Sequence, residues 1–298
     1  MEHLYEFFVQ SGVSARMNEP LAPHSSFRIG GAAKLSLFPK NRDEMMLCLS
    51  TLSARNIKRM VIGNASNVVF SDEGFDGAVV FCGGWREISI DGNTMTVSAG
   101  VSLASAATEA QRVGLSGLEF AHGIPATVGG AVFMNAGAFG GCMGDICQRC
   151  EYYDRESGCV GFFEGVEQKF GNRTSIYEKE PRYTVLGAEL RLAPDAKEAI
   201  GARMEDFLAR RKSTQPLEYP SAGSVFKRPE GHFAGKLIEE CGLKGERVGG
   251  AEVSVKHAGF IVNRGGATAA DVRALVELIR ERVMRETGVL LEPEIRFL

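Results

Sequence analysis

The segment from Gly117 to Gly144 constrains the fold more than any other part of the chain, because it is rich in glycine and also strongly apolar. Eight of its 28 residues are glycine, and side chains such as Ile124, Val132 and Phe139 lie between them. Flexible linkers are polar, so this segment is expected to be buried, where glycine lets the backbone approach another surface closely. That surface is either protein, at a packed helix–sheet corner, or a flat ligand, and the segment alone leaves both readings open.

The middle of this segment carries a helix-start signal. Residues 123–127 (Gly-Ile-Pro-Ala-Thr) are typical of a turn, and Thr127 can cap a short helix that begins at Val128. Free N–H groups at a helix start favour anions. If the segment is a cofactor loop, we therefore expect a phosphate to bind at this helix start.

Charge and composition exclude several classes of function. The chain has 298 residues and a formal net charge of −3, with no block of basic residues. Nucleic acid and anionic membranes are therefore poor partners. No run of about 18 apolar residues occurs, and the first residues lack a signal-peptide pattern, so we expect a cytoplasmic protein.

The seven cysteines are an odd number in a chain without a secretion signal, which favours reduced thiols. Cys142, Cys147 and Cys150 follow the spacing C-x4-C-x2-C, but no fourth ligand lies nearby. Because structural zinc normally takes four ligands, we predict no metal site.

Periodicity and turn residues predict a mixed fold. Helical patterns cover residues 41–54, 102–113, 195–212, 233–241 and 268–287. Strand patterns cover residues 59–62, 68–70, 148–155, 158–163, 183–192, 252–256, 259–263 and 289–298, and residues 86–98 are predicted as a hairpin. This irregular mixture predicts the α+β class rather than regular βαβ winding. The character of the chain changes near 195–215, where we expect a domain boundary.

A second loop of small residues, 63–67 (Gly-Asn-Ala-Ser-Asn), directly follows the strand predicted at 59–62. Such a loop can present N–H groups and hydroxyls to a pyrophosphate. It matches neither G-x-G-x-x-G nor a Walker loop, and taken alone it is more typical of an ordinary turn. Two loops of this kind in one domain favour a dinucleotide cofactor.

Two polar residues have a structural and a functional reading. Arg28, in the cluster from His24 to Gly31, either pairs with a carboxylate or contacts a ligand. Ser224 lacks the flanks of a nucleophile elbow and is more typical of a turn. It could donate a proton only beside a cofactor and a charged neighbour.

The last segment alternates polar and apolar residues. Glu292, Glu294 and Arg296 fall on one face, and a solvated face is the default reading. Pro293 indicates an edge strand or a bulge, where side chains are often redirected toward a site.

Three long, ordered matches point to one family. They are residues 123–137 (GIPATVGGAVFMNAG), 220–227 (PSAGSVFK) and 289–296 (VLLEPEIR). On these motifs the chain resembles the UDP-N-acetylenolpyruvoylglucosamine reductases (MurB), flavoenzymes of bacterial cell-wall synthesis, from His24 to Arg296. The short spacing from Arg173 to Ser224 resembles the subtype that lacks an extra tyrosine-bearing loop.

The resemblance implies a fold and a reaction. It implies an α+β protein with a two-part FAD-binding region of the vanillyl-alcohol-oxidase type at 1–195, in lobes of about 1–75 and 76–195. A C-terminal substrate domain at 196–298 follows. NADPH would reduce FAD, which would then pass hydride to the enolpyruvyl group of a UDP-sugar to give UDP-N-acetylmuramate. The chain would act as a monomer.

The resemblance also implies roles for individual residues. Ser224 would be the proton donor, Arg173 would hold the developing enolate charge, and Glu294 would be the catalytic glutamate. The implied cofactor-binding residues are Arg28, Gly63, Asn64, Ala65, Ser66, Asn67, Gly123, Ile124, Pro125, Ala126, Thr127 and Gly130. The candidates for the UDP diphosphate are Lys212, Lys227 and Arg228.

The chain departs from the family pattern at four positions. Asn172 stands where tyrosine usually precedes the arginine, and Arg228 stands where asparagine is common. Ala65 and Ala126 replace glycines of the two cofactor loops, which is tolerable if φ is negative at both positions.

Two other functions compete with this one. A different FAD-dependent oxidoreductase of the same superfamily would share the cofactor loops but not the pairing of Ser224 with Glu294. A catalytically silent nucleotide-binding regulator would keep the fold, although Arg173, Ser224 and Glu294 all remain chemically competent.

Overall fold

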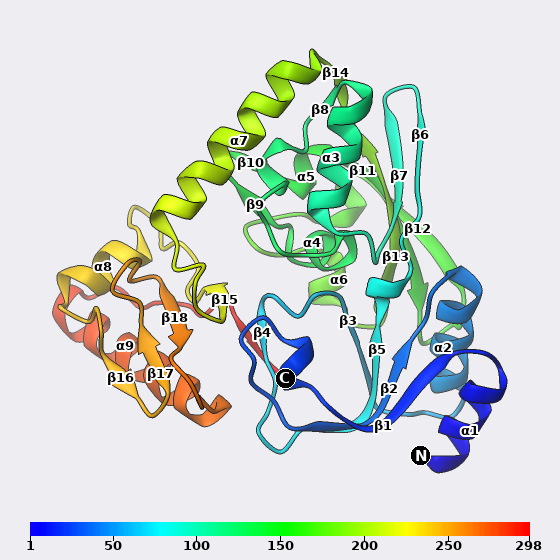
Figure 1. The fold of residues 1–298 in the computed structure, drawn as a ribbon, viewed down its shortest axis with the longest axis horizontal. Helices are drawn as coiled ribbons and strands as arrows, with labels where there is room; N and C mark the ends of the chain where they lie inside the picture. The colour runs from blue at the N-terminus through cyan, green and yellow to red at the C-terminus, as the bar shows by residue number, and fades with distance from the viewer. The chain divides into compact units, whose positions relative to one another are not determined.

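The computed structural model describes residues 1–298, which form two compact units (Figure 1). The first unit consists of Met1–Met17, Lys34–Asn64 and Gly77–Arg210, and the second of Asn18–Ala33, Ala65–Asp76 and Arg211–Leu298. The predicted domains divide the chain once, between residues 195 and 196, whereas each of these units is built from three separate pieces of chain.

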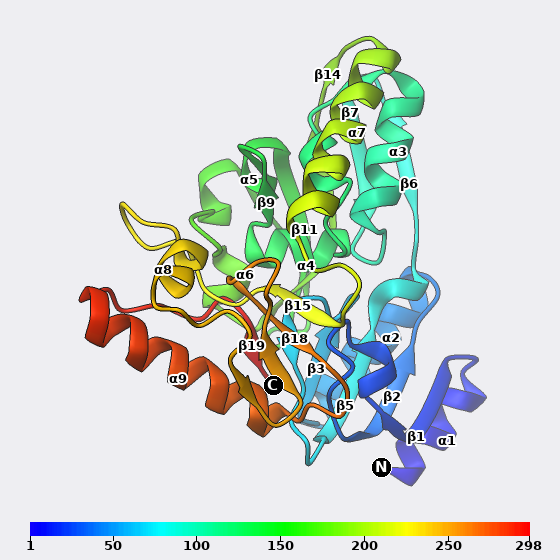
Figure 2. The same cartoon turned by 60° about the vertical axis from the view of Figure 1, so that its left-hand side comes forward.

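The first unit contains a five-stranded antiparallel sheet in the order β12-β11-β13-β7-β6. Its strands are β6 (Ile88–Asp91), β7 (Thr94–Ser98), β11 (Cys147–Asp154), β12 (Val160–Glu164) and β13 (Tyr183–Arg191). The helices α3 (Leu103–Val113) and α4 (Val128–Met134) lie beside this sheet (Figure 2).

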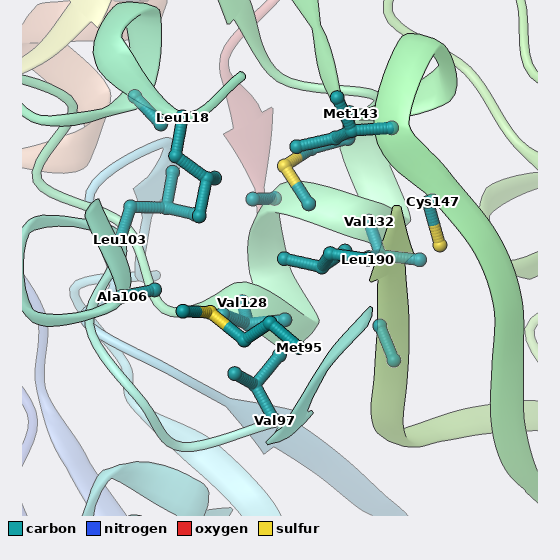
Figure 3. Packing of buried hydrophobic residues seen from close by; sticks show 14 of the residues in the cluster. Met95, Val97, Leu103, Ala106, Leu118, Val128, Val132, Met143, Cys147 and Leu190 are labelled. Carbon is teal, nitrogen blue, oxygen red and sulfur yellow. The ribbon is translucent and has the colours of Figure 1, made fainter. Parts of the chain in front are cut away.

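Burial of apolar side chains explains this packing. Met95 and Val97 of β7 and Leu190 of β13 meet Leu103 of α3 and Val132 of α4, and all five are almost fully buried (Figure 3). Fully burying a side chain of this kind contributes about 1.5–3 kcal/mol. The sheet and the two helices therefore share one core.

A second sheet of the first unit has the order β1-β2-β5-β3, with β3 (Arg59–Ile62) parallel to β5 (Phe75–Phe81). Its other strands are β1 (Ser14–Pro20) and β2 (Ala32–Phe38). The helices α1 (Glu2–Gln10) and α2 (Arg42–Ala54) share a buried cluster with β2 and β5.

The second unit is built on the sheet β15-β18-β17-β16. Its elements are β15 (Ser221–Ser224), α8 (Ala234–Glu240), β16 (Arg247–Val248), β17 (Ala251–Val253), β18 (Phe260–Asn263) and α9 (Ala269–Thr287). Helix α9, orange to red in Figure 2, packs along β16 and β17. Phe27 and Val69 lie in the same core as Leu275 of α9, which explains why two N-terminal pieces belong to this unit.

The remaining elements are short. They are η1 (Ala22–His24), β4 (Val68–Val69), η2 (Cys82–Gly84), β8 (Leu115–Ser116), η3 (Glu119–Ala121), β9 (Gly137–Ala138), β10 (Gly141–Cys142), α5 (Met143–Ile146), η4 (Gly165–Gln168), α6 (Ile176–Lys179), β14 (Ala193–Pro194) and β19 (Arg296–Phe297). The long α7 (Lys197–Thr214) spans the last boundary between the units. None of the helices is long and apolar enough to cross a membrane.

Helix ends were predicted well because their signals are local. Asn41 and Ser102 cap α2 and α3, Thr127 caps α4, and Gly114 and Gly288 end α3 and α9 in the left-handed conformation. The strand predicted over 289–298 is wrong in length, since only Arg296–Phe297 pairs with a strand, parallel to β4. The strands β1, β2 and β5 were not predicted.

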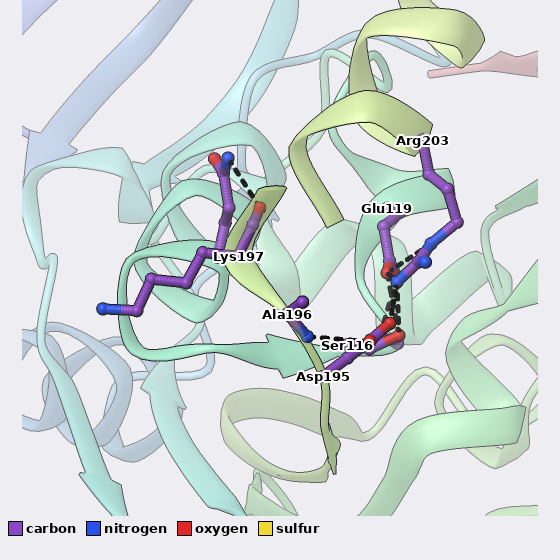
Figure 4. A network of polar contacts seen from close by, with 8 residues as sticks. Ser116, Glu119, Asp195, Ala196, Lys197 and Arg203 are labelled. Atoms are coloured by element: carbon purple, nitrogen blue, oxygen red, sulfur yellow. Dashed lines mark hydrogen bonds and ion pairs between the residues drawn. The ribbon is translucent and has the colours of Figure 1, made fainter. Parts of the chain in front are cut away.

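A buried carboxylate anchors α7 within the first unit (Figure 4). The Arg203 guanidinium donates to Glu119 at 2.7 Å and to Asp195 at 2.5 Å, and Ser116 Oγ donates to Glu119 at 2.8 Å. Burial alone would raise the pKa of Glu119, but the hydrogen bonds from Arg203, Gly117 and Ser116 outweigh it and lower that pKa. The network therefore contributes to stability while Glu119 is ionised.

We expect Arg203→Met to lower the free energy of unfolding by about 2 kcal/mol at pH 7, because it removes the guanidinium that pairs with the buried Glu119 charge and leaves only the weaker bonds from Ser116 and Gly117. Since the folded-state pKa of Glu119 is depressed, this contribution is fully present above the unfolded-state value and is lost as pH falls through the folded-state value. Denaturant unfolding of both proteins between pH 7 and pH 3 measures the difference.

The matched control is Arg210→Met, which removes an exposed ion pair with Asp206 on the same helix. Such pairs contribute at most about 1 kcal/mol. An Arg203→Met defect that stayed constant down to pH 3 would contradict the role of the Glu119 charge.

Candidate active site

The two predicted cofactor loops meet in the first unit. A Cβ added at Gly63 would lie 2.2 Å from Thr127 Oγ1, so only glycine permits this approach. The side chain of Asn64 donates to the Pro125 carbonyl at 3.2 Å. The beginning of the first loop is therefore held directly against the turn 123–127.

The start of α4 bears on the expectation that its N–H groups are free to bind a phosphate. The N–H of Val128 donates to the Val101 carbonyl at 2.8 Å and that of Gly129 to the Ala99 carbonyl at 2.9 Å. The N–H of Gly130 faces Thr127 Oγ1 at 3.4 Å. The amides of Val128 and Gly129 are therefore used within the protein, and binding of a phosphate by this turn stays a prediction.

Several glycines of the apolar run serve protein packing. A Cβ at Gly129 would lie 2.8 Å from the Ala99 Cβ, and one at Gly137 would lie 2.6 Å from the Gly141 carbonyl oxygen. The helix–sheet corner reading of the run therefore holds for these positions.

Arg173 lies on a tight turn between Gly171 and Thr174, whose backbones exchange hydrogen bonds at 3.0 and 3.3 Å. Its φ is +57°, a left-handed conformation that is uncommon for residues other than glycine and asparagine. Its guanidinium donates to the Gly137 carbonyl at 3.0 Å. Strain of this kind concentrates at functional sites.

The glycine-rich run holds this turn in place. Asn135 donates to the Gly171 carbonyl at 2.8 Å and accepts from the Gly144 N–H at 2.8 Å. The buried Ser175 donates to the Phe133 carbonyl at 2.8 Å. Sequence reasoning did not single out Asn135. The available signal was an asparagine directly after a predicted helix, since asparagine is favoured where a helix ends in the left-handed conformation. In the structure Asn135 has a φ of +45°.

In the second unit, residues 65–67 form the rest of the first cofactor loop. Ala65 has a φ of +47°, so the condition under which alanine would replace glycine without strain is not met here, whereas Ala126 does not have a positive φ. None of the N–H groups of Ala65, Ser66 and Asn67 has a backbone acceptor. Consecutive amides near a left-handed residue form a concave anion site, and these residues therefore fit a pyrophosphate.

We expect Ala65→Gly to raise the free energy of unfolding by about 0.5–1 kcal/mol. A left-handed alanine costs roughly 1–2 kcal/mol, and only part of that gain is offset by the greater freedom of glycine in the unfolded chain. Ala126→Gly is the matched control, and it should destabilise because no strain is relieved there. Denaturant unfolding measures both, and equal effects of the same sign would contradict the assignment.

Ser224 ends β15 with its side chain exposed. The pairing of β15 with β18 contains an irregularity between Ser221 and Ser224, and Gly223 has a φ of +79° within it. Bulges of this kind redirect side chains. The local backbone therefore presents the Ser224 hydroxyl outward.

Glu294 lies on the neighbouring segment. Its N–H donates to the Val225 carbonyl at 2.7 Å, and Phe226 and Pro293 form an antiparallel bridge. The predicted alternation holds for Leu291 and Ile295, which are buried, and for Glu292, which is exposed, whereas Glu294, Arg296 and Phe297 are all half-buried. The structure thus brings the backbones of Ser224 and Glu294 side by side.

The other predicted basic residues lie in this same unit. Arg28 is exposed with a φ of +56° and makes no ion pair. Lys227 forms an ion pair with Glu292, and Arg228 lies 4.0 Å above the Phe233 ring. Lys212 is exposed near the end of α7. A pairing of Arg28 with a carboxylate, one of its two readings, is not observed.

The cysteines do not come together as a metal site. All seven thiols are free, and no group of three His, Cys, Asp or Glu side chains is arranged to hold an ion. Burial raises the pKa of Cys147 to about 12. The thiols that are buried are therefore inert components of the core.

Comparison with known proteins decides between the competing functions. A model of the FAD binding domain matches residues 33–160, and a model of the C-terminal domain of UDP-N-acetylenolpyruvoylglucosamine reductase matches residues 215–298. The reductase of Moorella thermoacetica is 46% identical over 96% of this chain and 95% of its own length. That of Streptococcus pneumoniae is 43% identical over 97% of this chain and 96% of its own length.

The chain belongs to the UDP-N-acetylenolpyruvoylglucosamine reductase family. The solved structure of the Thermus caldophilus member has a TM-score of 0.80 and 37% identity, covering 96% of this chain and 98% of that one. Membership of this family confirms the α+β fold with an FAD-binding region and a C-terminal domain. It also confirms FAD as the cofactor and makes the chain an oxidoreductase.

Proposed function

We propose that this chain reduces the enolpyruvyl ether of UDP-N-acetylglucosamine enolpyruvate to UDP-N-acetylmuramate, a precursor of peptidoglycan, with NADPH as the electron source. The observation that carries this reaction is family membership over almost the whole chain, at 46% identity. The roles of individual residues below are our proposals, supported by the geometry of each unit.

The residues that would hold FAD include Ala65, Ser66 and Asn67, whose amides are free for a pyrophosphate. Gly63, Asn64 and Gly123–Gly130 would line the cofactor in the first unit, with side chains and carbonyls rather than with the amides at the start of α4. Arg28 is exposed and unpaired, so its guanidinium is available to the cofactor. When bound, FAD supplies the two-electron chemistry that moves a hydride from NADPH to the substrate.

Arg173 would neutralise the charge that develops on the substrate. Hydride addition to an enol ether conjugated with a carboxylate places negative charge on that carboxylate. A guanidinium can meet this charge with two parallel hydrogen bonds. Arg173 is suited to the task because its turn is held by Asn135 and Ser175, which limits its movement.

Ser224 would then deliver a proton to the substrate carbon that carries the developing charge. A serine hydroxyl is a weak acid, so it can donate only to a strongly basic intermediate. Glu294 lies on the adjacent segment, where a carboxyl group can support proton transfer. The Ser224 side chain is exposed, which supports a role in contact with a bound ligand.

Lys212, Lys227 and Arg228 remain our candidates for the UDP diphosphate. The ammonium of Lys227 is paired with Glu292, whose side chain is 70% exposed, so a diphosphate could displace it at little cost. We further propose that the protein acts as a monomer in the cytoplasm, where its free thiols stay reduced. Sedimentation of the purified protein tests the monomer.

The decisive experiment measures NADPH oxidation with and without the UDP-enolpyruvyl sugar. We expect oxidation at 340 nm to depend on that sugar, with a yellow protein that carries flavin absorbance. Oxidation that instead followed a simple alcohol or oxygen would favour a different flavin enzyme. A colourless protein that bound UDP-sugars without turnover would favour a silent regulator.

A further inference from the structure

We propose that Ser26 and Asn67 are positioning residues that connect the cofactor loop to the two catalytic groups, so that binding of FAD at the loop orders Ser224 and Glu294. This inference rests on the proposed function, because it takes residues 65–67 as the cofactor loop. All the residues involved lie in the second unit.

Ser26 joins the loop to the strand of the proton donor. Its hydroxyl donates to the Ser221 carbonyl at 2.7 Å, and its N–H donates to the Ala65 carbonyl at 3.4 Å. The same hydroxyl lies 3.3 Å from that Ala65 carbonyl, but it has only one proton and the Ser221 bond is much shorter. One residue thus contacts the cofactor loop and the beginning of β15.

Asn67 joins the loop to the segment of the catalytic glutamate. Its side-chain amide donates to the Glu294 carbonyl at 3.2 Å, and its own carbonyl accepts from the Arg296 N–H at 3.0 Å. These two bonds hold the backbone on both sides of Ile295, directly after Glu294. The side-chain amide of Asn67 is therefore used for protein contact, and its backbone N–H has no backbone acceptor.

The two catalytic segments are also bonded to each other. The Glu294 N–H donates to the Val225 carbonyl at 2.7 Å, and the Lys227 N–H donates to the Glu292 carbonyl at 2.9 Å. The loop and the two segments thus form a closed set of hydrogen bonds. An error of about 1 Å in a catalytic group can slow a reaction about a hundredfold, so these links bear directly on proton transfer.

The loop itself has a feature that makes it responsive to a ligand. Ala65 is strained at a φ of +47°, and the N–H groups of residues 65–67 have no backbone acceptors. A pyrophosphate that satisfied these amides would stabilise the strained conformation. Through Ser26 and Asn67, the same conformation determines where Ser221 and Glu294 lie.

The first test compares half-reactions in Ser26→Ala, Ser26→Thr and the parent protein. We expect flavin reduction by NADPH to stay within twofold in Ser26→Ala, while flavin reoxidation by the UDP-enolpyruvyl sugar slows at least tenfold. Ser26→Thr keeps the hydroxyl and should recover most of that rate. Equal slowing of both half-reactions, or normal reoxidation, would overturn the proposal.

Ser254→Ala is the matched control for a structural effect. Its hydroxyl is buried in the same unit and accepts from the N–H groups of Lys256 and His257. Unlike Ser26, it makes no hydrogen bond to the cofactor loop or to the catalytic segments. We expect it to lower stability and leave both half-reactions unchanged. A reoxidation defect as large as that of Ser26→Ala would make the effect of Ser26 merely structural.

The second test does not depend on turnover. In the parent protein, FAD should slow amide hydrogen exchange in residues 221–227 and in residues 292–298. Ser26→Ala should lose the effect mainly in the first peptide, and Asn67→Ala mainly in the second. If FAD protects neither peptide while the parent protein still reduces the UDP-enolpyruvyl sugar, the connection is refuted and the proposed function stands. If that sugar is not reduced, the proposed function itself fails.

Discussion

Ser224→Ala should slow reoxidation of the reduced flavin by the UDP-enolpyruvyl sugar about a thousandfold, which corresponds to about 4 kcal/mol of transition-state stabilisation. The methyl group of alanine cannot donate a proton, and the strand geometry around Ser224 depends on Gly223 and on backbone pairing rather than on the hydroxyl. Flavin reduction by NADPH involves no proton from Ser224 and should keep its rate.

Rapid-mixing absorbance of the flavin measures the two half-reactions separately. Ser221→Ala is the matched control, because Ser221 lies on the same strand and contributes its carbonyl rather than its hydroxyl to the bond from Ser26. That variant should behave like the parent protein. If Ser224→Ala slowed reduction by NADPH as much as reoxidation, Ser224 would not be the specific proton donor.

Arg173→Lys should slow the same reoxidation step about a hundredfold, or about 3 kcal/mol. Lysine keeps the positive charge but loses the planar pair of donors that meets a carboxylate. Both residues carry a Cβ, so the strained φ of +57° is common to both proteins. The loss therefore reports on the head group and not on relief of backbone strain.

The same rapid-mixing experiment measures this variant, with thermal unfolding to verify the fold. Arg191→Lys is a suitable control, since Arg191 is exposed in the same unit and its guanidinium donates to the Thr94 hydroxyl at 3.3 Å. Reoxidation at the parent rate in Arg173→Lys would argue against the enolate-binding role. A large loss in the control would point to a general sensitivity of the unit to arginine replacement.

Features encoded by a few neighbouring residues could be predicted from the sequence. The capping pair of α2 involves residues three positions apart, Asn41 with Glu44. The hairpin of β6 and β7 needs only a short turn at Gly92. Such signals are local because the hydrogen bonds that they describe are local.

Features that depend on distant partners could not be predicted. The strand β19 is parallel to β4, more than 200 positions away in the chain, and no pattern within residues 289–298 reveals where pairing stops. The strands β1, β2 and β5 were missed for the same reason. Their assignment to a sheet depends on one another and on helices that cover them.

The cofactor loops show most clearly which features can be predicted from the sequence and which depend on distant partners. Both contain small residues after a strand or turn, and the sequence indicated anion binding at both. Only the structure shows that Val128 and Gly129 donate to carbonyls of residues 101 and 99, whereas the amides of residues 65–67 have no backbone acceptor. The availability of an N–H depends on acceptors brought in from elsewhere in the chain.

The sequence by itself determined the family, the reaction class and the residue types of the site, because long ordered motifs such as GIPATVGGAVFMNAG and PSAGSVFK record them directly. It also predicted that the glycine-rich run from Gly117 to Gly144 would be buried, which is correct for Val128 and Val132 but wrong for Phe139, whose exposed fraction is 42%. Only the tertiary structure decided what that run does: glycines such as Gly129 and Gly137 pack closely against protein, and its Asn135 holds the turn of Arg173. The physical reason is that glycine permits close approach, while the partner that approaches is supplied by the fold.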